Sequence, residues 1–315
     1  MKQQFVESLQ DGDVVNDYFV AVRKDLRDQQ SGGKFLGMVF KDRTGEIGGI
    51  LWQNAPSVAR MFDVGDVVNV RGAVTTYQDR LQIRVDQVLP LREGEYDVAS
   101  LIHVAENASQ LYAELERMAQ TVANPHLRRL LDLFLQDDAF VENFTRAVAG
   151  KRWHHAYQGG LVEHCYEMAR ICETMCELFP HLDRDLLLTA VVLHDIGKLD
   201  ELSHGINVNY TSPGKLLGHL AIGMDMVNER IRAIDDFPEN LRLHLLHCIL
   251  SHHGELENGS PVVPKTMEAL VLFQCDNLSA QTNAFGRVIA ETKDKERPWS
   301  DYIALINRQI WTKEE

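Results

Sequence analysis

The feature of this chain that most constrains its fold is a change in hydrophobic periodicity near residue 92. From about Val14 to Leu91, apolar and polar residues alternate in short runs separated by Gly, Asp and Asn. Beyond residues 91–95, apolar residues recur at i, i+3, i+4 and i+7 almost to the end. Alternation with period two is typical of half-buried strands, and the longer period is typical of amphipathic helices. The sequence therefore predicts a multidomain α and β protein, with a β domain over residues 1–95 and helices after it.

The first region is expected to form a small closed barrel. We predict strands near Asp17–Lys24, Phe35–Asp42, Glu46–Trp52, Val67–Tyr77 and Leu81–Leu89. A short helical piece, Ala55–Phe62, separates the third strand from the fourth. This order is that of an OB-fold, a barrel whose middle strands and connecting loops bind single-stranded nucleic acid. Residues 1–95 are therefore predicted to be an OB-fold nucleic-acid-binding domain.

The second region is expected to be an all-α bundle. The predicted helices are Ala108–Val122, Pro125–Leu135, Asp137–Ala149, Leu161–Phe179, Arg184–Asp195, Leu216–Ile234, Pro238–Leu250 and Lys265–Asn283. We divide this region into a helical connector over residues 96–150 and a second helical domain with C-terminal helices over residues 151–315. The sequence contains no internal repeat or Pro-rich linker.

The charge distribution limits how the chain can contact nucleic acid. The formal net charge is −14, which argues against a protein that coats polyanions over its whole surface. From Val14 to Arg92 there are 11 Lys and Arg against 9 Asp and Glu, and the rest of the chain holds 21 against 37. The candidate nucleic-acid contacts are Phe35 and Tyr77 as base platforms, with Arg23, Lys34, Lys41, Arg71 and Arg84 as backbone contacts. Barrel core and a solvated surface are the alternatives for these aromatic and basic side chains.

The cellular location is predicted from two absences in the sequence. The N-terminus lacks the apolar core of a signal peptide, and the longest apolar run, around Leu186 to Leu193, is too short to span a bilayer. The five cysteines are odd in number and lie in apolar helical contexts, as expected of reduced thiols. We therefore expect a cytoplasmic protein with no membrane partner. The sequence leaves open whether the chain forms a homo-oligomer.

Histidines are concentrated in one part of the chain. Eleven of the 13 lie between His154 and His253. Several of them are paired with another His or with an acidic residue, in His154-His155, Glu163-His164, His194-Asp195 and His252-His253. His219 stands alone between these pairs, and Asp276 follows further along the chain. Imidazole and carboxylate are ligands for divalent ions such as Mn²⁺, Fe²⁺, Co²⁺ and Zn²⁺. A carboxylate can bridge two ions through its two oxygens, and we expect Gly197 to end the helix before it so that ions can reach the His194-Asp195 pair.

These residues resemble the ordered pattern of the HD superfamily of metal-dependent phosphohydrolases, which is His, then His-Asp, then Asp. The matching positions are His164, His194-Asp195 and Asp276. This resemblance implies that residues 151–315 form an HD phosphohydrolase domain with C-terminal helices. By this resemblance the matching residues hold one ion, while Asp195, His219, His252 and His253 hold a second, as in two-metal members. We expect Mn²⁺ as the most favoured ion, with Fe²⁺, Co²⁺, Mg²⁺ and Zn²⁺ as alternatives.

A more specific resemblance covers nearly the whole chain. The stretch 154–164 (HHAYQGGLVEH), the HDIGK block at 194–198, LLGH at 216–219 and SHHG at 251–254, together with the OB-like front, are similar to the YhaM-type 3′-5′ exoribonucleases. This resemblance implies hydrolysis of single-stranded RNA, and of single-stranded DNA as a further substrate, to nucleoside 5′-monophosphates. The Gly-Tyr-Pro signature of HD enzymes that open cyclic dinucleotides is absent after the double His, where Glu257-Asn258-Gly259-Ser260-Pro261 stands instead.

The expected chemistry uses a metal-activated water as nucleophile, because two ions both activate water and neutralise the phosphoryl group. The catalytic candidates are Asp195, Lys198 and His155. Lys198 is expected to contact phosphoryl oxygens, with a solvated helix-end lysine as the alternative. His155 is expected to contact phosphate or protonate the leaving oxygen, with a supporting role behind the ligands as the alternative. The rival functions are a small-nucleotide phosphohydrolase and a nucleic-acid-binding regulator.

Overall fold

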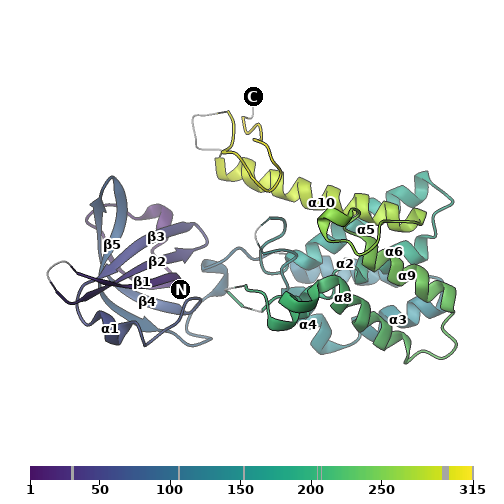
Figure 1. The fold of residues 1–315 in the computed structure, drawn as a ribbon, viewed down its shortest axis with the longest axis horizontal. Helices are drawn as coiled ribbons and strands as arrows, with labels where there is room; N and C mark the ends of the chain where they lie inside the picture. Colours follow the sequence, from purple (N-terminus) through teal and green to yellow (C-terminus); the bar gives the residue numbers. More distant parts are fainter. Residues whose placement is uncertain are drawn as a thin grey trace. The chain divides into compact units, whose positions relative to one another are not determined.

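The structure is a computed structural model, and it describes residues 1–29, 32–105, 107–151, 153–203, 205–206, 208–292 and 298–313. It divides into two compact units, one mainly of Met1–Val104 and the other mainly of Ala105–Ser203 and Asn209–Glu315. The first unit contains the strands and the second contains the long helices (Figure 1). Among the described residues, no helix combines the length and the apolar character needed to cross a membrane.

The first unit is a closed five-stranded barrel. Its strands are β1 (Val14–Asp28), β2 (Lys34–Asp42), β3 (Gly45–Leu51), β4 (Val67–Tyr77) and β5 (Arg80–Pro90), with α1 (Ala55–Val58) between β3 and β4 and the 3-10 turns Val6–Ser8 and Val98–Ser100. The strand order around the barrel is β1-β2-β3-β5-β4, and only the β3–β5 pair is parallel among these five strands. This arrangement confirms the predicted OB-fold.

Strand β1 closes the barrel because it pairs on both sides. Its first half, Val14 to Val20, pairs with β4, and its second half pairs with β2 across an irregularity between Ala21 and Arg23. The strand is therefore longer than the predicted Asp17–Lys24. Inside the barrel, Phe40 packs so closely on β3 that a Cβ at Gly49 would lie 2.5 Å from its ring. Only glycine fits at that position without displacing the ring.

The barrel unit extends to Val104, beyond the predicted boundary at residue 95. Leu101 packs with Tyr18, Val20 and Val67 in a small apolar cluster of its own. The Tyr18 hydroxyl also accepts a hydrogen bond of 3.2 Å from the backbone N–H of Asp97. The segment after β5 has no periodic pattern, so these long-range contacts could not be foreseen from the sequence.

The second unit is a helical bundle. Its helices are α2 (Ala108–Ala119), α3 (Pro125–Leu135), α4 (Asp138–Arg146), α5 (Gly160–Leu178), α6 (Arg184–Leu193), α7 (Lys198–Glu201), α8 (Ser212–Ile231), α9 (Glu239–Ser251) and α10 (Met267–Thr292), with a 3-10 turn at Leu256–Asn258. Every residue of α6 is at least partly buried, and those from Leu186 to Leu193 are fully buried. This helix therefore runs through the centre of the bundle.

The structure differs most from the predicted helices at three places. Helix α7 was not predicted, because four residues are too few to show a periodic pattern. Helix α8 begins at Ser212 instead of Leu216, since the Thr211 side chain accepts a hydrogen bond of 2.9 Å from the backbone N–H of Gly214 and caps the helix. Helix α10 continues past the predicted end at Asn283 to Thr292.

Candidate metal centre

Asp195 lies at the centre of a buried cluster of histidines. Helix α6 ends at Leu193, so the His194-Asp195 pair stands beyond the helix end. Oδ2 of Asp195 lies 3.3 Å from Nε2 of His194 and 4.0 Å from Nε2 of His164. Oδ1 lies 3.5 Å from Nε2 of His252 and 3.6 Å from Nε2 of His219. Each carboxylate oxygen therefore faces a different pair of imidazoles, which is the arrangement a bridging carboxylate needs.

Two further predicted ligands complete the cluster on either side of Asp195. On the Oδ2 side, Oδ1 of Asp276 from α10 lies 3.1 Å from Nε2 of His164. On the Oδ1 side, Nε2 of His253 lies 3.1 Å from Nε2 of His219. The groups whose ligand atoms lie close enough to hold an ion are His164 with His194 and Asp276, His194 with Asp195 and His252, His219 with His252 and His253, and His154 with His155 and His164. All seven predicted metal ligands thus meet in one place.

The second nitrogen of each imidazole has its own hydrogen-bond acceptor. In three rings Nδ1 faces a backbone oxygen: Val191 at 2.8 Å from His194, Ile249 at 2.7 Å from His252, and Asn258 at 3.0 Å from His253. In His219, Nδ1 faces the Glu201 carboxylate at 3.0 Å. In His164, Nδ1 faces Oγ of Ser279 at 2.9 Å. Carbonyl and carboxylate oxygens only accept, and the Ser279 hydroxyl donates to Glu167. Nδ1 therefore carries the proton in all five rings, which leaves the Nε2 lone pairs directed into the cluster.

Several atoms in the cluster are buried without a hydrogen-bond partner among the described residues. They are Nε2 of His164, Nε2 of His194 and Oδ1 of Asp195. An unpaired buried polar atom costs about 1–3 kcal/mol, so three of them at one point need a compensating group. Neutral imidazole nitrogen and carboxylate oxygen are the donor set that Mn²⁺, Fe²⁺, Co²⁺ and Zn²⁺ accept. The residues present therefore fit divalent metal ions.

The protonation states of the cluster also suit metal binding. Burial alone would raise the pKa of Asp195 and Asp276, but Lys198 and neighbouring histidines hold the pKa of Asp195 below the usual range. For Asp276, His164 and the other nearby histidines lower the pKa in the same way. Burial lowers the pKa of His164 and His252, and lowers that of His253 to about 4. The carboxylates are thus ionised and these imidazoles neutral near pH 7, which are the forms that bind metal.

His194 is the exception among the ligands whose pKa is shifted. Burial lowers its pKa, but the neighbouring Asp195 carboxylate outweighs burial and raises the pKa above the ordinary value. A proton on His194 therefore competes with an ion for Nε2 near neutral pH.

Lys198 begins α7 and turns toward the bridging carboxylate. Its Nζ lies 2.5 Å from Oδ2 of Asp195, and its side chain is only 10% exposed. Burial lowers the pKa of Lys198, but Asp195 and Asp276 raise it above the ordinary value, so the side chain stays charged. The alternative of a solvated lysine at a helix end does not describe this side chain.

The role predicted for Gly197 needs correction. Helix α6 ends earlier, at Leu193, and Gly197 has an ordinary right-handed φ of −61°. Its small size matters instead, because a Cβ there would lie 2.0 Å from the backbone oxygen of His219 and 2.6 Å from the backbone nitrogen of Gly223. Glycine thus lets α7 approach the backbone of α8, which brings His219 to Asp195.

Glu201 is a site residue that the sequence analysis missed. Gly218 has a left-handed φ of 73° and interrupts α8, so the N–H of His219 has no helical acceptor. That N–H donates to Oε1 of Glu201 at 3.1 Å, and Nδ1 of His219 donates to the same oxygen at 3.0 Å. Burial raises the pKa of Glu201, but the bonds from His219 lower it below the ordinary value. A glycine inside a helical pattern, directly before a candidate ligand, was the available signal.

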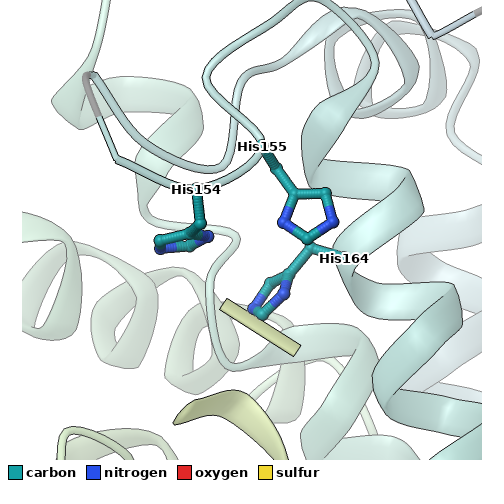
Figure 2. A group of neighbouring side chains, drawn as sticks. All are labelled: His154, His155 and His164. Carbon is teal, nitrogen blue, oxygen red and sulfur yellow. The ribbon is translucent and has the colours of Figure 1, made fainter. Parts of the chain in front are cut away.

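The two histidines before α5 occupy different environments. His155 is fully buried, with its Nε2 3.3 Å from Oε2 of Glu167 and its backbone N–H donating to Asn283. His154 instead lines a cavity of about 500 Å³ that also touches Lys198 and His219. Figure 2 shows the rings of His154, His155 and His164 gathered around one point. His155 itself does not line the cavity, so the predicted contact between His155 and substrate is not supported by its position.

The predicted nucleic-acid contacts are spread over the barrel surface. Phe35 is partly buried and packs against Trp52, with ring centroids 5.0 Å apart and planes tilted by 32°. Tyr77 is exposed and pairs with Arg80, at the start of β5. Trp52 follows Leu51, which pairs with Val85, further along β5. The two predicted platforms thus lie apart, and Trp52 is the aromatic neighbour of Phe35.

The basic candidates divide into two kinds. Arg23 and Lys34 form ion pairs of 2.7 Å with Asp25 and Asp28. Lys41, Arg71 and Arg84 are exposed and form no ion pair with an acidic residue in the part of the chain that the structure describes. The latter three are therefore the basic side chains with charge available for phosphate.

Comparison with known families agrees with both units. Residues 161–281 match the family model described as HD domain, and residues 20–91 match the model described as OB-fold nucleic acid binding domain. The chain carries an OB-fold followed by an HD domain. HD domains bind divalent metal ions, and the His/Asp groups of this HD domain lie where such ions can be held. The predicted fold class is therefore confirmed, and the HD domain indicates a metal-dependent phosphohydrolase.

Solved structures with an OB-fold are also similar to this chain. The second OB-fold domain of replication protein A from Methanococcus maripaludis has 23% identity over 30% of this chain and 100% of that chain, with a TM-score of 0.25. The OB domain of MM0293 from Methanosarcina mazei has 20% identity over 33% and 93%, with a TM-score of 0.26. A replication protein A heterotrimer bound to ssDNA has 22% identity and a TM-score of 0.19, and the match covers 24% of this chain and 57% of that chain.

Proposed function

We propose that this protein is a metal-dependent 3′-5′ exoribonuclease of the YhaM type, which releases nucleoside 5′-monophosphates from single-stranded RNA. The observation that carries the proposal is the position of Asp195, whose two oxygens face two separate groups of imidazoles. A centre of this kind suits hydrolysis of a phosphodiester. The OB-fold on the same chain supports nucleic acid as the substrate.

The seven predicted ligands would hold two ions. His164, His194 and Asp276 would bind the first, His219, His252 and His253 the second, and Asp195 would bind both. When bound, such ions lower the pKa of a water molecule and neutralise charge on the phosphoryl group. Ligation of this kind explains why four Nε2 atoms, those of His164, His194, His219 and His252, face the Asp195 carboxylate.

Lys198 and His154 would contact the phosphoryl group, because both line the cavity beside the cluster. The charged Lys198 would stabilise negative charge that develops on the phosphoryl oxygens. Burial lowers the pKa of His154 to about 2, so its ring is neutral and can donate one hydrogen bond to a phosphoryl oxygen. His155 would support a metal ligand and not contact the substrate. Its Nε2 lies near Glu167, which accepts a hydrogen bond from Ser279, and the Ser279 hydroxyl in turn contacts Nδ1 of His164.

The barrel would hold the strand behind the bond that is cleaved. Phe35 and Trp52 together present an aromatic surface, and stacking on such a surface accepts any base. Lys41, Arg71 and Arg84 would supply charge for phosphates. This division of roles lets the HD domain act at a strand end while the OB-fold retains the rest of the strand.

The test is a degradation assay with two labelled forms of one oligoribonucleotide and Mn²⁺. A 5′-labelled strand should give a ladder of shortened products, and a 3′-labelled strand should release labelled mononucleotide from the start. Asp195→Ala should give neither. An equivalent DNA strand tested in parallel measures the preference between the two nucleic acids.

Other outcomes would reject the proposal. An intact strand together with hydrolysis of small nucleotides would assign the HD domain to a small-nucleotide phosphohydrolase, with the barrel as a scaffold. An intact strand that binds tightly, with no hydrolysis of any phosphodiester, would indicate a nucleic-acid-binding regulator. Internal fragments from a circular strand would show an endonuclease.

A further inference from the structure

The cavity beside the metal centre has a lining that the proposed hydrolysis does not fully use. Its volume is about 500 Å³, within the ~300–1,000 Å³ range of small-molecule sites. Lys198, His154 and His219 connect it to the metal centre. Trp153 and Tyr210 also line it, and neither residue has a role in the chemistry described above.

Trp153 brings a buried donor to this cavity. Its indole Nε1 is buried and has no hydrogen-bond partner among the described residues. A buried tryptophan N–H normally finds an acceptor, and leaving it unpaired is destabilising. His154, the next residue, also has a buried Nδ1 without a described partner and lines the same cavity. Two adjacent lining residues that each carry an unpaired buried polar atom favour a polar ligand with acceptor atoms.

Tyr210 brings an aromatic ring to the same cavity. Its backbone is held by an antiparallel bridge to Leu202, the residue that follows α7. The residue is 45% exposed, and the Nζ of Lys151 lies 5.4 Å from the ring centroid. That Nζ also donates to Oδ1 of Asn209 at 2.9 Å, which keeps the lysine beside the ring. The cavity therefore combines an anchored aromatic surface with a positive charge.

We propose that Trp153 and Tyr210 form a binding site for the base of the nucleotide that the metal centre releases. This inference rests on the proposed function, because it takes the phosphate of that nucleotide to lie at Lys198 and the metal ligands. A nucleotide has the required features, since its base has an aromatic face for stacking and ring or carbonyl acceptors for the indole N–H. Stacking on aromatic side chains accepts every base, as a nuclease without sequence preference requires.

The test compares two ligands that differ only in the base. Binding of AMP and of ribose 5-phosphate to the full chain with Mn²⁺ is measured by isothermal titration calorimetry. Both carry the same phosphate, so the difference in affinity isolates the base. We expect AMP to bind about 5- to 150-fold more tightly, because base stacking contributes ~1–3 kcal/mol and every 1.4 kcal/mol is about tenfold. Tyr210→Ala and Trp153→Ala should each remove most of that preference and leave the affinity for ribose 5-phosphate unchanged.

A matched variant controls for the loss of an exposed aromatic ring. Tyr302→Ala removes a tyrosine that is 60% exposed and does not line the cavity, so it should leave both affinities unchanged. If circular dichroism shows that Trp153→Ala is unfolded, Tyr210→Ala decides the result. Equal affinity of the unmodified chain for both ligands, or an unchanged preference in folded Tyr210→Ala, would overturn the assignment.

Failure of this inference can be separated from failure of the proposed function. Binding of AMP needs no turnover, so a chain that prefers AMP through Trp153 and Tyr210 but leaves oligoribonucleotides intact would keep the base site and lose the exonuclease. A chain that shortens strands but does not discriminate between AMP and ribose 5-phosphate would keep the exonuclease and lose the base site.

Discussion

Removing the Glu201 carboxylate should weaken one metal site and spare the other. Glu201 accepts both the Nδ1–H and the backbone N–H of His219 through one oxygen, at 3.0 and 3.1 Å, and its side chain is 11% exposed. Without it, the imidazole loses the partner that orients it. Loss of such a partner typically costs 10- to 100-fold in metal affinity, or about 1.4–2.7 kcal/mol. The cost in Glu201→Ala should fall on the site that contains His219.

The assay is a Mn²⁺ titration by calorimetry that resolves the two sites. The unmodified chain should bind two ions, and Glu201→Ala should weaken one of them by about 10- to 100-fold. His164→Ala should weaken the other site, because His164 faces Oδ2 of Asp195 and not Oδ1. Asp200→Asn is the matched control, since this neighbouring acidic residue on α7 is exposed, and it should change neither site.

One result would refute this reasoning. If folded Glu201→Ala bound both ions with affinities within about threefold of the unmodified chain, Glu201 would not position a ligand.

The two unpaired N–H groups of His219 should in addition lower the free energy of unfolding of the metal-free protein by about 1–3 kcal/mol each. Urea denaturation in the presence of a chelator measures that loss.

Three further changes test other parts of the structure. Asp195→Ala should abolish strand degradation and leave binding of single-stranded nucleic acid by the barrel nearly unchanged in a gel-shift assay; residual degradation would contradict the bridging role. Gly197→Ala should lower the free energy of unfolding by at least about 1–3 kcal/mol, because its Cβ would lie 2.0 Å from the His219 oxygen, whereas Gly286→Ala, with nothing within 4 Å, should not be destabilising. Mn²⁺ affinity should fall as pH drops from 8 to 6, because the raised pKa of His194 keeps a competing proton there. The raised pKa of His194 also stabilises the metal-free protein, fully below about pH 6.5, and this stabilisation is lost as pH rises through the raised pKa. Urea denaturation with a chelator should therefore show that the contribution of His194 to the free energy of unfolding decreases with pH.

Much of the fold followed from local patterns. The alternation before residue 92 predicted five strands and the helical period after it predicted a bundle, because both periods reflect which side chains face a core. The boundary at Val104 and the four-residue α7 did not follow, since neither leaves a periodic signal. Strand β1 was predicted too short because its two ends pair with different neighbours, and pairing partners are not encoded in one strand alone.

The sequence by itself determined which residue types are present for metal binding and in which order, because imidazole and carboxylate chemistry belongs to the residue and not to its surroundings. The tertiary structure decided the rest. It placed His154 and not His155 in the cavity, paired Phe35 with Trp52 and not with Tyr77, and brought Glu201 to His219 through the break at Gly218. These choices depend on contacts between segments far apart in the chain, so packing of the helices and strands settles them, and no local pattern does.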